Sequence, residues 1–295
     1  MSGVVRLRHD DPGFPRAVLR ARPQPEELYA EGDLSLLERP TVAIVGSRTP
    51  SSYGVRVAYE AARALAEAGV VVVSGLARGL DARAHRGALD AGGGTIAVLG
   101  CGTDIAYPEE NRPLLEEVRA RGLLLSELPP GTEPRPFRFP ARNRIIAALG
   151  QCLLVVEGKP RGGTSNTVDW AQKCDRRVFA VPGRLGEELA LGPNLLIQQD
   201  AHVYLEPADI LQALGVRATS RRPANAPCED TARARAELSG AEAALYDLIG
   251  PDPVHVDVLA DRAALEPGLL LAALSSLELQ GLVTQLPGKH FALAS

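Results

Sequence analysis

The chain has 295 residues, of which 45% are apolar and 4% aromatic, with 29 glycines and 23 prolines. This apolar content is enough for a packed core and excludes wholesale disorder, and the length corresponds to about two domains. No uncharged apolar run approaches the roughly 18 residues of a membrane span. The four cysteines form no CxxC pair, which argues against a disulfide framework and a zinc site. We expect a cytoplasmic protein with no membrane contact, no metal and no cofactor.

The formal net charge of −4 hides a segregation of charge along the chain. Residues 41–183 contain 18 basic and 14 acidic side chains, whereas residues 239–295 contain 2 basic and 7 acidic ones. A polyanionic ligand is therefore expected to meet the middle of the chain and not its C-terminal part.

Short aliphatic runs alternate with helical stretches from Thr41 onward. Such continuous runs are typical of strands that are buried on both faces of a parallel sheet. The runs are Val42–Val45, Val70–Ser74, Thr95–Leu99, Leu123–Ser126, Cys152–Val156 and Val178–Val181. Between them, Gly54–Ala68, Asp81–Ala91 and Glu110–Arg121 show helical spacing of polar and apolar residues. The pattern predicts an α/β fold with an extended, Rossmann-like, doubly wound parallel sheet.

The chain is expected to divide into four parts. Residues 1–40 form a short N-terminal extension, 41–216 the Rossmann-like domain, 217–238 a linker and 239–295 a small winged-helix-like domain. The linker is predicted because 217–238 is rich in Ala, Arg and Pro and lacks an apolar face. The last domain is predicted from three short apolar-periodic segments that precede two short strands around Pro287-Gly288.

The third of these segments, Pro267–Gln280, contains neither Lys nor Arg and is flanked by acidic residues. A recognition helix without cations cannot neutralise phosphates or bond guanine edges. The C-terminal domain is therefore expected to be a protein-docking or regulatory module, not a reader of duplex DNA.

The loop after the first predicted strand contains Gly46, Ser47 and Arg48. A glycine at the carboxyl end of the first strand, before a helix N-terminus, is where α/β folds bind anions. The loop has neither the GxGxxG pattern nor a GK[ST] element, so the dinucleotide fingerprint and the P-loop are excluded. Arg48 places a full charge where a Rossmann loop normally uses backbone alone. The alternative is an ion pair between Arg48 and a neighbouring carboxylate.

The next two strand ends carry further small and polar residues. Gly75 allows a ligand to approach the backbone, and Asp81 is expected to cap the following helix. His85 has no Ser or Cys nucleophile at a suggestive spacing, so a solvated or capping histidine is expected in place of a general base. Cys101 is expected to be a buried packing residue.

Residues 133–150, EPRPFRFPARNRIIAALG, combine arginines with aromatic residues. Arginines for phosphates beside aromatics for base stacking are the ingredients of a single-strand site. The residues concerned are Arg135, Phe137, Arg138, Phe139, Arg142 and Arg144. Pro140 is predicted to begin a helix, so that Asn143 and Arg144 lie in its first turn near the crevice. The alternative is an ordinary basic loop whose phenylalanines are buried in the core.

Residues 157–172, EGKPRGGTSNTVDWAQ, follow the fifth predicted strand. Gly162 and Gly163 open a nest of backbone N–H groups that, with Thr164 and Ser165, stands at another helix N-terminus. Because the carboxyl ends of parallel strands meet at one edge of the sheet, these loops are expected to converge on one electropositive crevice. The sequence thus predicts a phosphate-bearing ligand.

Six motifs, VAIVGSR, SGLARGLDARAHRGAL, LGCGTDIAYPEEN, FPARNRIIAALG, RGGTSNT and VFAVPG, occur in the order and spacing of the DNA-processing protein A family, DprA or Smf. Over about 41–205 the chain resembles this family closely. The resemblance implies a non-enzymatic homodimer that binds single-stranded DNA in natural transformation, protects incoming strands and loads the RecA recombinase.

By this resemblance Arg48 contacts phosphate or base, and Arg142, Asn143 and Arg144 line the pocket. Residues 163–165 would hold a phosphate. Residues 193–204, which include Leu195, Leu196, Ile197 and His202, correspond to the dimer and RecA-contacting region of the family.

The alternative function is that of an enzyme. RGGTSNTVD resembles the PGGxGTxxE loop of nucleotide phosphoribohydrolases and brings Asp169 near the acid position. A hydrolase needs a carboxylate over the scissile bond, whereas the predicted crevice is richer in arginine than in acids. A scaffold without a ligand would leave the arginine cluster unexplained.

Overall fold

The computed structural model describes residues 3–216, 238, 240–249, 254–263, 265–286 and 288–293. The chain divides into two compact units, Met1–Ser220 and Arg221–Ser295. All but the last residue of the predicted linker 217–238 lies outside the described residues, and so does Pro287 of the predicted hairpin. Leu238 is buried in the core of the second unit.

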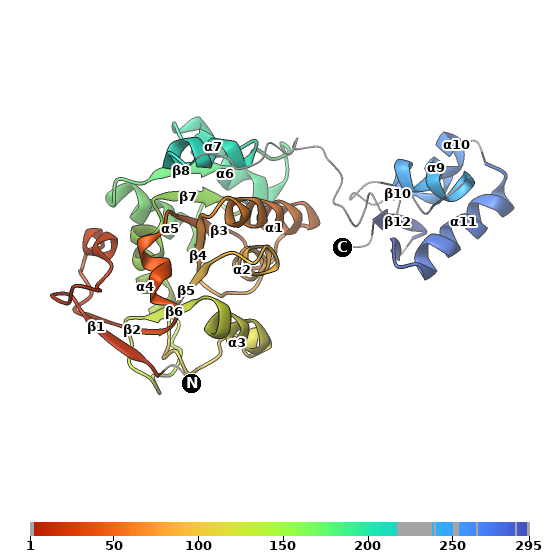
Figure 1. Cartoon of the computed structure of the whole chain (residues 1–295). Helices are drawn as coiled ribbons and strands as arrows, with labels where there is room; N and C mark the ends of the chain where they lie inside the picture. Colours follow the sequence, from red (N-terminus) through yellow and green to blue (C-terminus); the bar gives the residue numbers. More distant parts are fainter. Residues whose placement is uncertain are drawn as a thin grey trace. The chain divides into compact units, whose positions relative to one another are not determined.

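Within the described residues, the first unit contains one nine-stranded sheet (Figure 1). Its strands, in the order in which they lie, are β1 (Val5–Arg8), β2 (Glu27–Gly32), β6 (Leu123–Ser126), β5 (Thr95–Leu99), β4 (Val71–Ser74), β3 (Thr41–Val45), β7 (Cys152–Val155), β8 (Arg177–Ala180) and β9 (His202–Val203). The α-helices are α1 (Ser52–Glu67), α2 (Leu80–Asp90), α3 (Arg112–Arg121), α4 (Arg138–Leu149), α5 (Gly163–Lys173), α6 (Glu188–Gln198) and α7 (Pro207–Leu214). Three short 3-10 helices are η1 (Arg16–Arg20), η2 (Leu34–Glu38) and η3 (Glu109–Asn111).

The predicted fold class is confirmed, and the six predicted runs are the six central strands. From β6 to β9 every neighbouring pair is parallel. The order reverses at β3, which has β4 on one side and β7 on the other. In open α/β sheets such a switch point leaves a crevice outside the carboxyl ends of the strands. The fold thus places the candidate site beyond the ends of β3 and β7.

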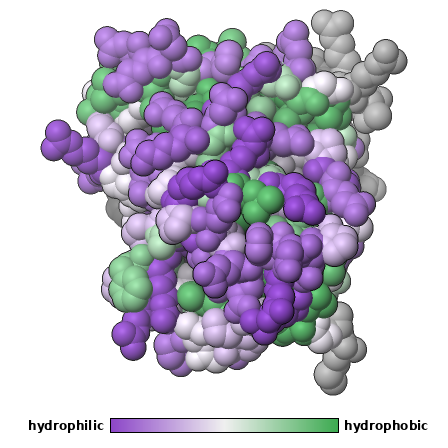
Figure 2. All heavy atoms as spheres, turned by 90° about the vertical axis from the view of Figure 1, so that its left-hand side faces the viewer, coloured by the Kyte–Doolittle hydropathy of each residue, from purple (hydrophilic) through white to green (hydrophobic). Residues whose placement is uncertain are grey.

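The N-terminal segment, expected to be an extension, is part of the sheet. The strand β2 pairs with β1 and with β6 in antiparallel register, and Phe14, Val18 and Leu28 are buried in the core. The strand β1 forms an outer edge, and its Arg6 pairs with Glu27. The side of the molecule on which β1 lies is covered mainly by hydrophilic residues (Figure 2). Charged side chains of this kind protect a sheet edge from further pairing.

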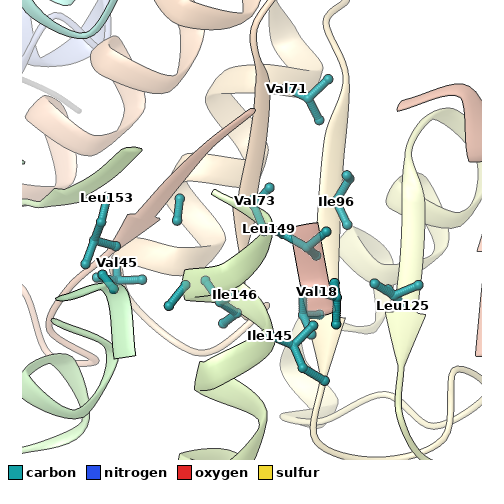
Figure 3. Close-up of a cluster of buried hydrophobic side chains, with 14 of the residues drawn as sticks. Val18, Val45, Val71, Val73, Ile96, Leu125, Ile145, Ile146, Leu149 and Leu153 are labelled. Atoms are coloured by element: carbon teal, nitrogen blue, oxygen red, sulfur yellow. The ribbon is translucent and has the colours of Figure 1, made fainter. Parts of the chain in front are cut away.

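Two hydrophobic layers cover the two faces of the sheet. On one face, α4, α5 and η1 pack on alternate side chains of the central strands, and Ile145, Ile146 and Val18 share one buried cluster with Val73 and Ile96 (Figure 3). On the other face, α1, α2 and α7 cover the intervening side chains of β3, β4 and β7. The α3 helix covers β5 and β6 on that second face. Strands buried on both sides explain why their sequences are continuous aliphatic runs.

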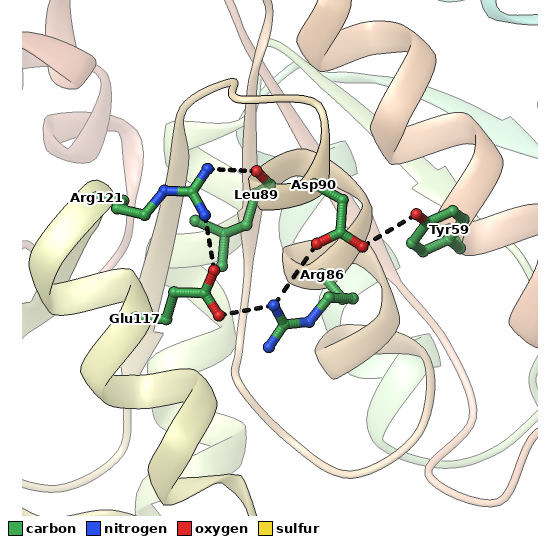
Figure 4. Close-up of polar contacts among 6 residues, drawn as sticks. All are labelled: Tyr59, Arg86, Leu89, Asp90, Glu117 and Arg121. Atoms are coloured by element: carbon green, nitrogen blue, oxygen red, sulfur yellow. Dashed lines mark hydrogen bonds and ion pairs between the residues drawn. The ribbon is translucent and has the colours of Figure 1, made fainter.

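Ion pairs join the helices of the second face (Figure 4). The Glu117 carboxylate of α3 accepts from Arg86 of α2 at 2.6 Å and from Arg121 at 2.7 Å. Arg86 also pairs with Asp90, to which the Tyr59 hydroxyl of α1 donates at 3.0 Å. Arg86 and Arg121 are therefore satisfied by carboxylates of the protein itself.

The second unit has the winged-helix outline that the sequence predicted. Its described elements are α9 (Gly240–Leu248), β10 (Val254–His255), α10 (Val256–Ala263), α11 (Pro267–Leu279), β11 (Val283–Leu286) and β12 (His290–Leu293). Leu245, Leu259 and Leu277 are completely buried in its core. In the part of the chain that the structure describes, no helix is long and apolar enough to cross a bilayer.

Candidate functional site

A cavity of about 520 Å³ lies at the switch point of the sheet. Its walls come from the loops after β3, β4, β5 and β7 and from the first turns of α4 and α5, so the predicted convergence of loops is present. The predicted site residues that line it are Gly46, Ser47, Arg48, Phe139, Arg142, Asn143, Gly162, Gly163 and Thr164. Gly75, Arg144 and Ser165 are not among the lining residues.

The loop after β3 is held in shape by a carboxylate from the neighbouring strand end. Glu157, which follows β7 and is 6% exposed, accepts from the Ser51 backbone N–H at 3.0 Å and from the Ser51 hydroxyl. The Ser51 hydroxyl in turn accepts from the Gly54 N–H at 3.1 Å and so caps α1. Arg48 is exposed and forms no ion pair with any described residue. Its guanidinium is therefore available to an anion.

Arg142 lies at the base of the cavity, and its charge is almost completely buried. The side chain is 6% exposed, and it donates to the Gly75 carbonyl at 2.7 Å and to the Val98 carbonyl. Burial lowers the pKa of Arg142 to about 10, while the nearby Asp81 carboxylate opposes the shift. A Cβ on Gly75 would lie 2.6 Å from the guanidinium nitrogens, so a larger residue there would displace the Arg142 side chain. Arg142 thus joins the ends of β4 and β5.

Asp81 and His85 differ from the sequence prediction. The α2 helix begins at Leu80 after Gly79, so Asp81 is not its cap but accepts from the Gly75 N–H at 3.2 Å, and its burial raises its pKa. His85 is completely buried and not solvated. It accepts from the Leu76 N–H at 3.3 Å, and its Nδ1 lies 2.7 Å from the Thr95 hydroxyl. Burial, with the Arg142 charge second, lowers its pKa to about 3.

An aromatic pair forms one wall of the cavity. The rings of Tyr107 and Phe139 are stacked with their centroids 4.9 Å apart, and Tyr107 is 48% exposed. Neither ring is an ordinary core residue, so the core alternative for Phe139 is wrong. Phe137 is also outside the core, at 66% exposed. An exposed ring that is already stacked offers its other face to a flat ligand.

The α4 helix begins at Arg138, two residues before the predicted start at Pro140. Its register points Arg142, Asn143 and Arg144 in different directions. Asn143 lines the cavity, whereas Arg144 lies elsewhere and is 4% exposed. Arg144 donates to Glu127 at 2.5 Å and to the Pro23 carbonyl at 2.9 Å. The expectation that Arg144 lines the pocket is therefore wrong. Residues two apart on a helix differ by about 200° around its axis, so Arg142 and Arg144 cannot face one crevice.

The loop between β7 and α5 forms the opposite wall. Gly162 and Gly163 are exposed, and a Cβ on either would meet no atom within 4 Å, so space lies open beside them. The Ser165 hydroxyl is occupied, because it donates to the Gly162 carbonyl at 2.8 Å and accepts from the Gly162 N–H at 3.0 Å. Lys159 and Arg161 from the same loop line the cavity, and Lys159 pairs with Glu188 at 2.7 Å.

The lining is strongly cationic. Four basic side chains line the cavity, namely Arg48, Arg142, Lys159 and Arg161, and among the described lining residues the one carboxylate is Asp81. Asp169, the acid of the alternative enzymatic reading, is not a lining residue. Tyr107 and Leu189 were missed by sequence reasoning. The sequence signal that could have found Tyr107 is an aromatic residue before a proline, next to the glycine-rich end of β5.

Fold and site together define a Rossmann-like α/β protein with a crevice suited to a phosphate-bearing ligand with a flat base. Comparison with known proteins gives the family. The sequence model of the DNA recombination-mediator protein A family matches residues 6–215, and that of the DprA winged helix domain matches residues 229–289. The chain belongs to the DNA recombination-mediator protein A family, also called DprA or Smf.

Individual relatives agree with this membership. Protein Smf of Synechocystis sp. is 35% identical over 97% of this chain and 79% of its own length. The crystal structure of DNA processing protein A from Streptococcus pneumoniae is 40% identical, with a TM-score of 0.69 over 71% of this chain and 74% of that one. The structure of DNA processing protein A from Helicobacter pylori, described as having a unique single-stranded DNA binding mode, is 32% identical with a TM-score of 0.65, over 72% of this chain and 98% of that one.

Proposed function

We propose that this protein binds single-stranded DNA in the crevice beyond β3 and β7. The observation that carries the proposal is the pairing of two unlike walls across one cavity. The stacked Tyr107–Phe139 rings form one wall, and the cationic loop with Lys159 and Arg161 forms the other. Stacking platforms beside a cationic groove are the physical basis of single-strand binding. The single-stranded DNA binding mode described for the Helicobacter pylori relative supports the same ligand.

A single strand fits this arrangement better than a duplex. Stacking on Tyr107 requires an unpaired base, because a base inside a duplex is stacked on its neighbours and cannot enter a concave site. Arg48, at the edge between the two walls, then meets the sugar-phosphate chain. In this proposal the protein acts as a binding protein and not as an enzyme, and its residues hold the strand without breaking a bond.

We further propose that the protein works as a homodimer that protects incoming DNA during natural transformation and loads RecA recombinase onto it. The surface proposed for both contacts is formed by α6 and β9, with Leu195, Leu196, Ile197 and His202. The edge strand β9 is only two residues long; its Val203 is 40% exposed, and Leu205, two residues further on, is 73% exposed. Exposed apolar side chains at an uncovered sheet edge favour contact with another chain.

Fluorescence anisotropy with labelled oligo-dT and a matched duplex tests the DNA proposal. We expect preferential binding of the single strand, with an affinity that falls as salt rises, by about 0.7 log units per log unit of salt for each phosphate contact. Arg48→Ala lowers the affinity about 5- to 150-fold, which corresponds to about 1–3 kcal/mol. The matched control is Arg63→Ala on α1, whose side chain is paired with Glu67. Equal affinity of wild type and Arg48→Ala removes the role given to Arg48, and absence of binding to either DNA rejects the function.

Sedimentation equilibrium tests the dimer. Leu205→Glu places a charge at the proposed interface and is expected to give a monomer, whereas Leu279→Glu, at a 90% exposed position in the second unit, leaves the mass unchanged. RecA loading is measured as the lag before RecA hydrolyses ATP on DNA coated with a single-strand-binding protein. A lag that this protein does not shorten contradicts the loading role.

A further inference from the structure

A second group of cations lies at the opposite end of α5 from the crevice. It consists of Arg20 and Arg22, at and just after the end of η1, and Lys173 and Arg176, at and just after the end of α5. We call these four residues the η1–α5 cluster. The Arg20 guanidinium donates to the Cys174 carbonyl at 3.3 Å, which joins the two segments, and Cys174 Sγ lies 3.6 Å from the Arg20 carbonyl.

The charges of the cluster lie close together. Burial lowers the pKa of Arg176, and the charge of Arg20 lowers it further, which places the two guanidinium groups within electrostatic range. Burial raises the pKa of the Cys174 thiol, and the charges of Arg176, Arg20 and Arg22 oppose this rise. The Asp175 carboxylate favours the charged form of Arg176, and Asp200 lines the same pocket as Arg176.

The cluster differs from the paired arginines of α2 and α3 in how it is satisfied. Arg86 of α2 and Arg121 of α3 are both neutralised by Glu117 of α3 (Figure 4). Among the described residues, no carboxylate forms an ion pair with a member of the cluster, whereas Asp175 stays exposed. Each of its three arginines uses one terminal nitrogen, on a backbone carbonyl: Arg20 on Cys174, Arg22 on Leu19 and Ala21, and Arg176 on Ala148.

Since an arginine has five N–H donors, the exposed Arg20 and Arg22 keep most of their donors free for an anion. Arg20, Arg22 and Lys173 are exposed to solvent. An aromatic ring completes the group, because Lys173 lies 4.5 Å over the half-buried Trp170 ring. Exposed cations beside an aromatic residue are a combination that suits a single nucleic-acid strand.

We propose that the η1–α5 cluster is a second contact for the sugar-phosphate chain of the single strand whose bases enter the crevice. This inference rests on the proposed function. The α5 helix connects the two places, since its first residues line the crevice and its last carries the cluster. Eleven residues at 1.5 Å each separate them by about 16 Å, or roughly five nucleotides at the 3.4 Å spacing of a stacked strand.

The test is a length series of oligo-dT, from about 4 to about 20 nucleotides, measured by anisotropy. The full chain is compared with the double variant Arg22→Gln/Lys173→Gln. The control Arg56→Gln/Arg63→Gln removes the same charge from α1, which covers the other face of the sheet. We expect the cluster variant to bind the shortest oligonucleotides like the wild type and the longest ones roughly tenfold more weakly, with a salt slope reduced by about 1.4 for two lost phosphate contacts.

Equal binding of wild type and cluster variant at every length overturns the second contact and leaves the crevice proposal intact. An equal loss at all lengths also overturns it, because the two residues would then act on the crevice itself or on folding. Thermal unfolding of both variants separates those two causes. If the wild type binds no oligonucleotide of any length, the proposed function fails and the second contact fails with it.

Discussion

At the scale of single residues, three arginines of similar sequence context have three different environments. Arg48 is exposed in the crevice, Arg142 is buried beneath it, and Arg144 is paired with Glu127 away from it. Sequence reasoning identified all three as ligand-binding residues, because charge and spacing are visible in a sequence. The helical register that separates Arg142 from Arg144 was also available there, since alternate residues of a helix face opposite ways.

Arg142→Ala is expected to act on stability. The substitution removes the donor of the Gly75 and Val98 carbonyls and leaves the buried Asp81 without its neighbouring charge. Loss of one partner from a buried charge pair costs about 3–5 kcal/mol. Urea unfolding monitored by circular dichroism measures this loss, and Arg48→Ala should change the same free energy by less than about 0.5 kcal/mol. A stable Arg142→Ala protein that no longer binds DNA would instead make Arg142 a ligand contact.

His85 makes a pH-dependent contribution to stability. Its pKa is about 3 in the folded protein and about 6.5 in an unfolded chain, so below pH 6.5 the unfolded state takes up a proton that the folded state does not. Stability is therefore lost as the pH falls. The contribution of His85 to the free energy of unfolding should drop by about 2 kcal/mol between pH 7 and pH 5.

The measurement for His85 is the slope of unfolding free energy against pH, compared between the wild type and His85→Asn. Other titrating groups are common to both proteins, so the difference in slope belongs to His85. The variant should have the flatter profile between pH 5 and pH 7. Parallel profiles would show that His85 is accessible to protons in the folded state.

At the scale of elements, the helix proposed for the dimer is joined directly to the crevice. The Gly158 N–H donates to the Leu189 carbonyl at 2.8 Å, and the Gly192 N–H donates to the Gly158 carbonyl at 3.0 Å. The β7–α5 loop and α6 therefore share a backbone contact. A substitution in α6 is therefore expected to shift the loop that carries Lys159 and Arg161, although neither of those two residues is substituted.

Gly192→Ala tests this contact. A Cβ on Gly192 would lie 2.2 Å from the Gly158 carbonyl oxygen, so the helix or the loop must move. Such overpacking costs about 1–3 kcal/mol, or about 2–12 °C in Tm for a domain of this size. Gly268→Ala on α11, where a Cβ would meet nothing within 4 Å, is the control and should be neutral or slightly stabilising. An unchanged Tm for Gly192→Ala would mean that the packing of α6 on the loop is loose.

The elements that the sequence predicted well are those buried on both faces. Their aliphatic runs gave all six central strands within one residue of the observed bounds. Among the described residues four strands were missed, namely β1, β2, β9 and β10. The first two carry alternating patterns such as Val5-Arg6-Leu7-Arg8, which are typical of half-buried strands, and β9 and β10 are too short for any pattern.

At the scale of the whole molecule, the two units differ in charge and in the ligand they suit. The first unit holds the cationic crevice, while residues 239–295 contain 2 basic and 7 acidic side chains. The α11 helix, at the position of a recognition helix, has Leu269, Leu271 and Leu279 exposed and lacks cations. We therefore expect the second unit to make no contribution to the affinity of the crevice for DNA.

A truncated chain that ends at Val216 tests this expectation. The first unit has its own hydrophobic layers on both faces of the sheet, so it should fold alone. Its affinity for a short oligo-dT should match that of the full chain within about twofold, because all residues that line the cavity are retained. Circular dichroism and sedimentation confirm that the comparison is between folded proteins of the same oligomeric state. A folded fragment with much weaker binding would show that the second unit takes part in holding the strand, and that its acidic surface does not exclude DNA.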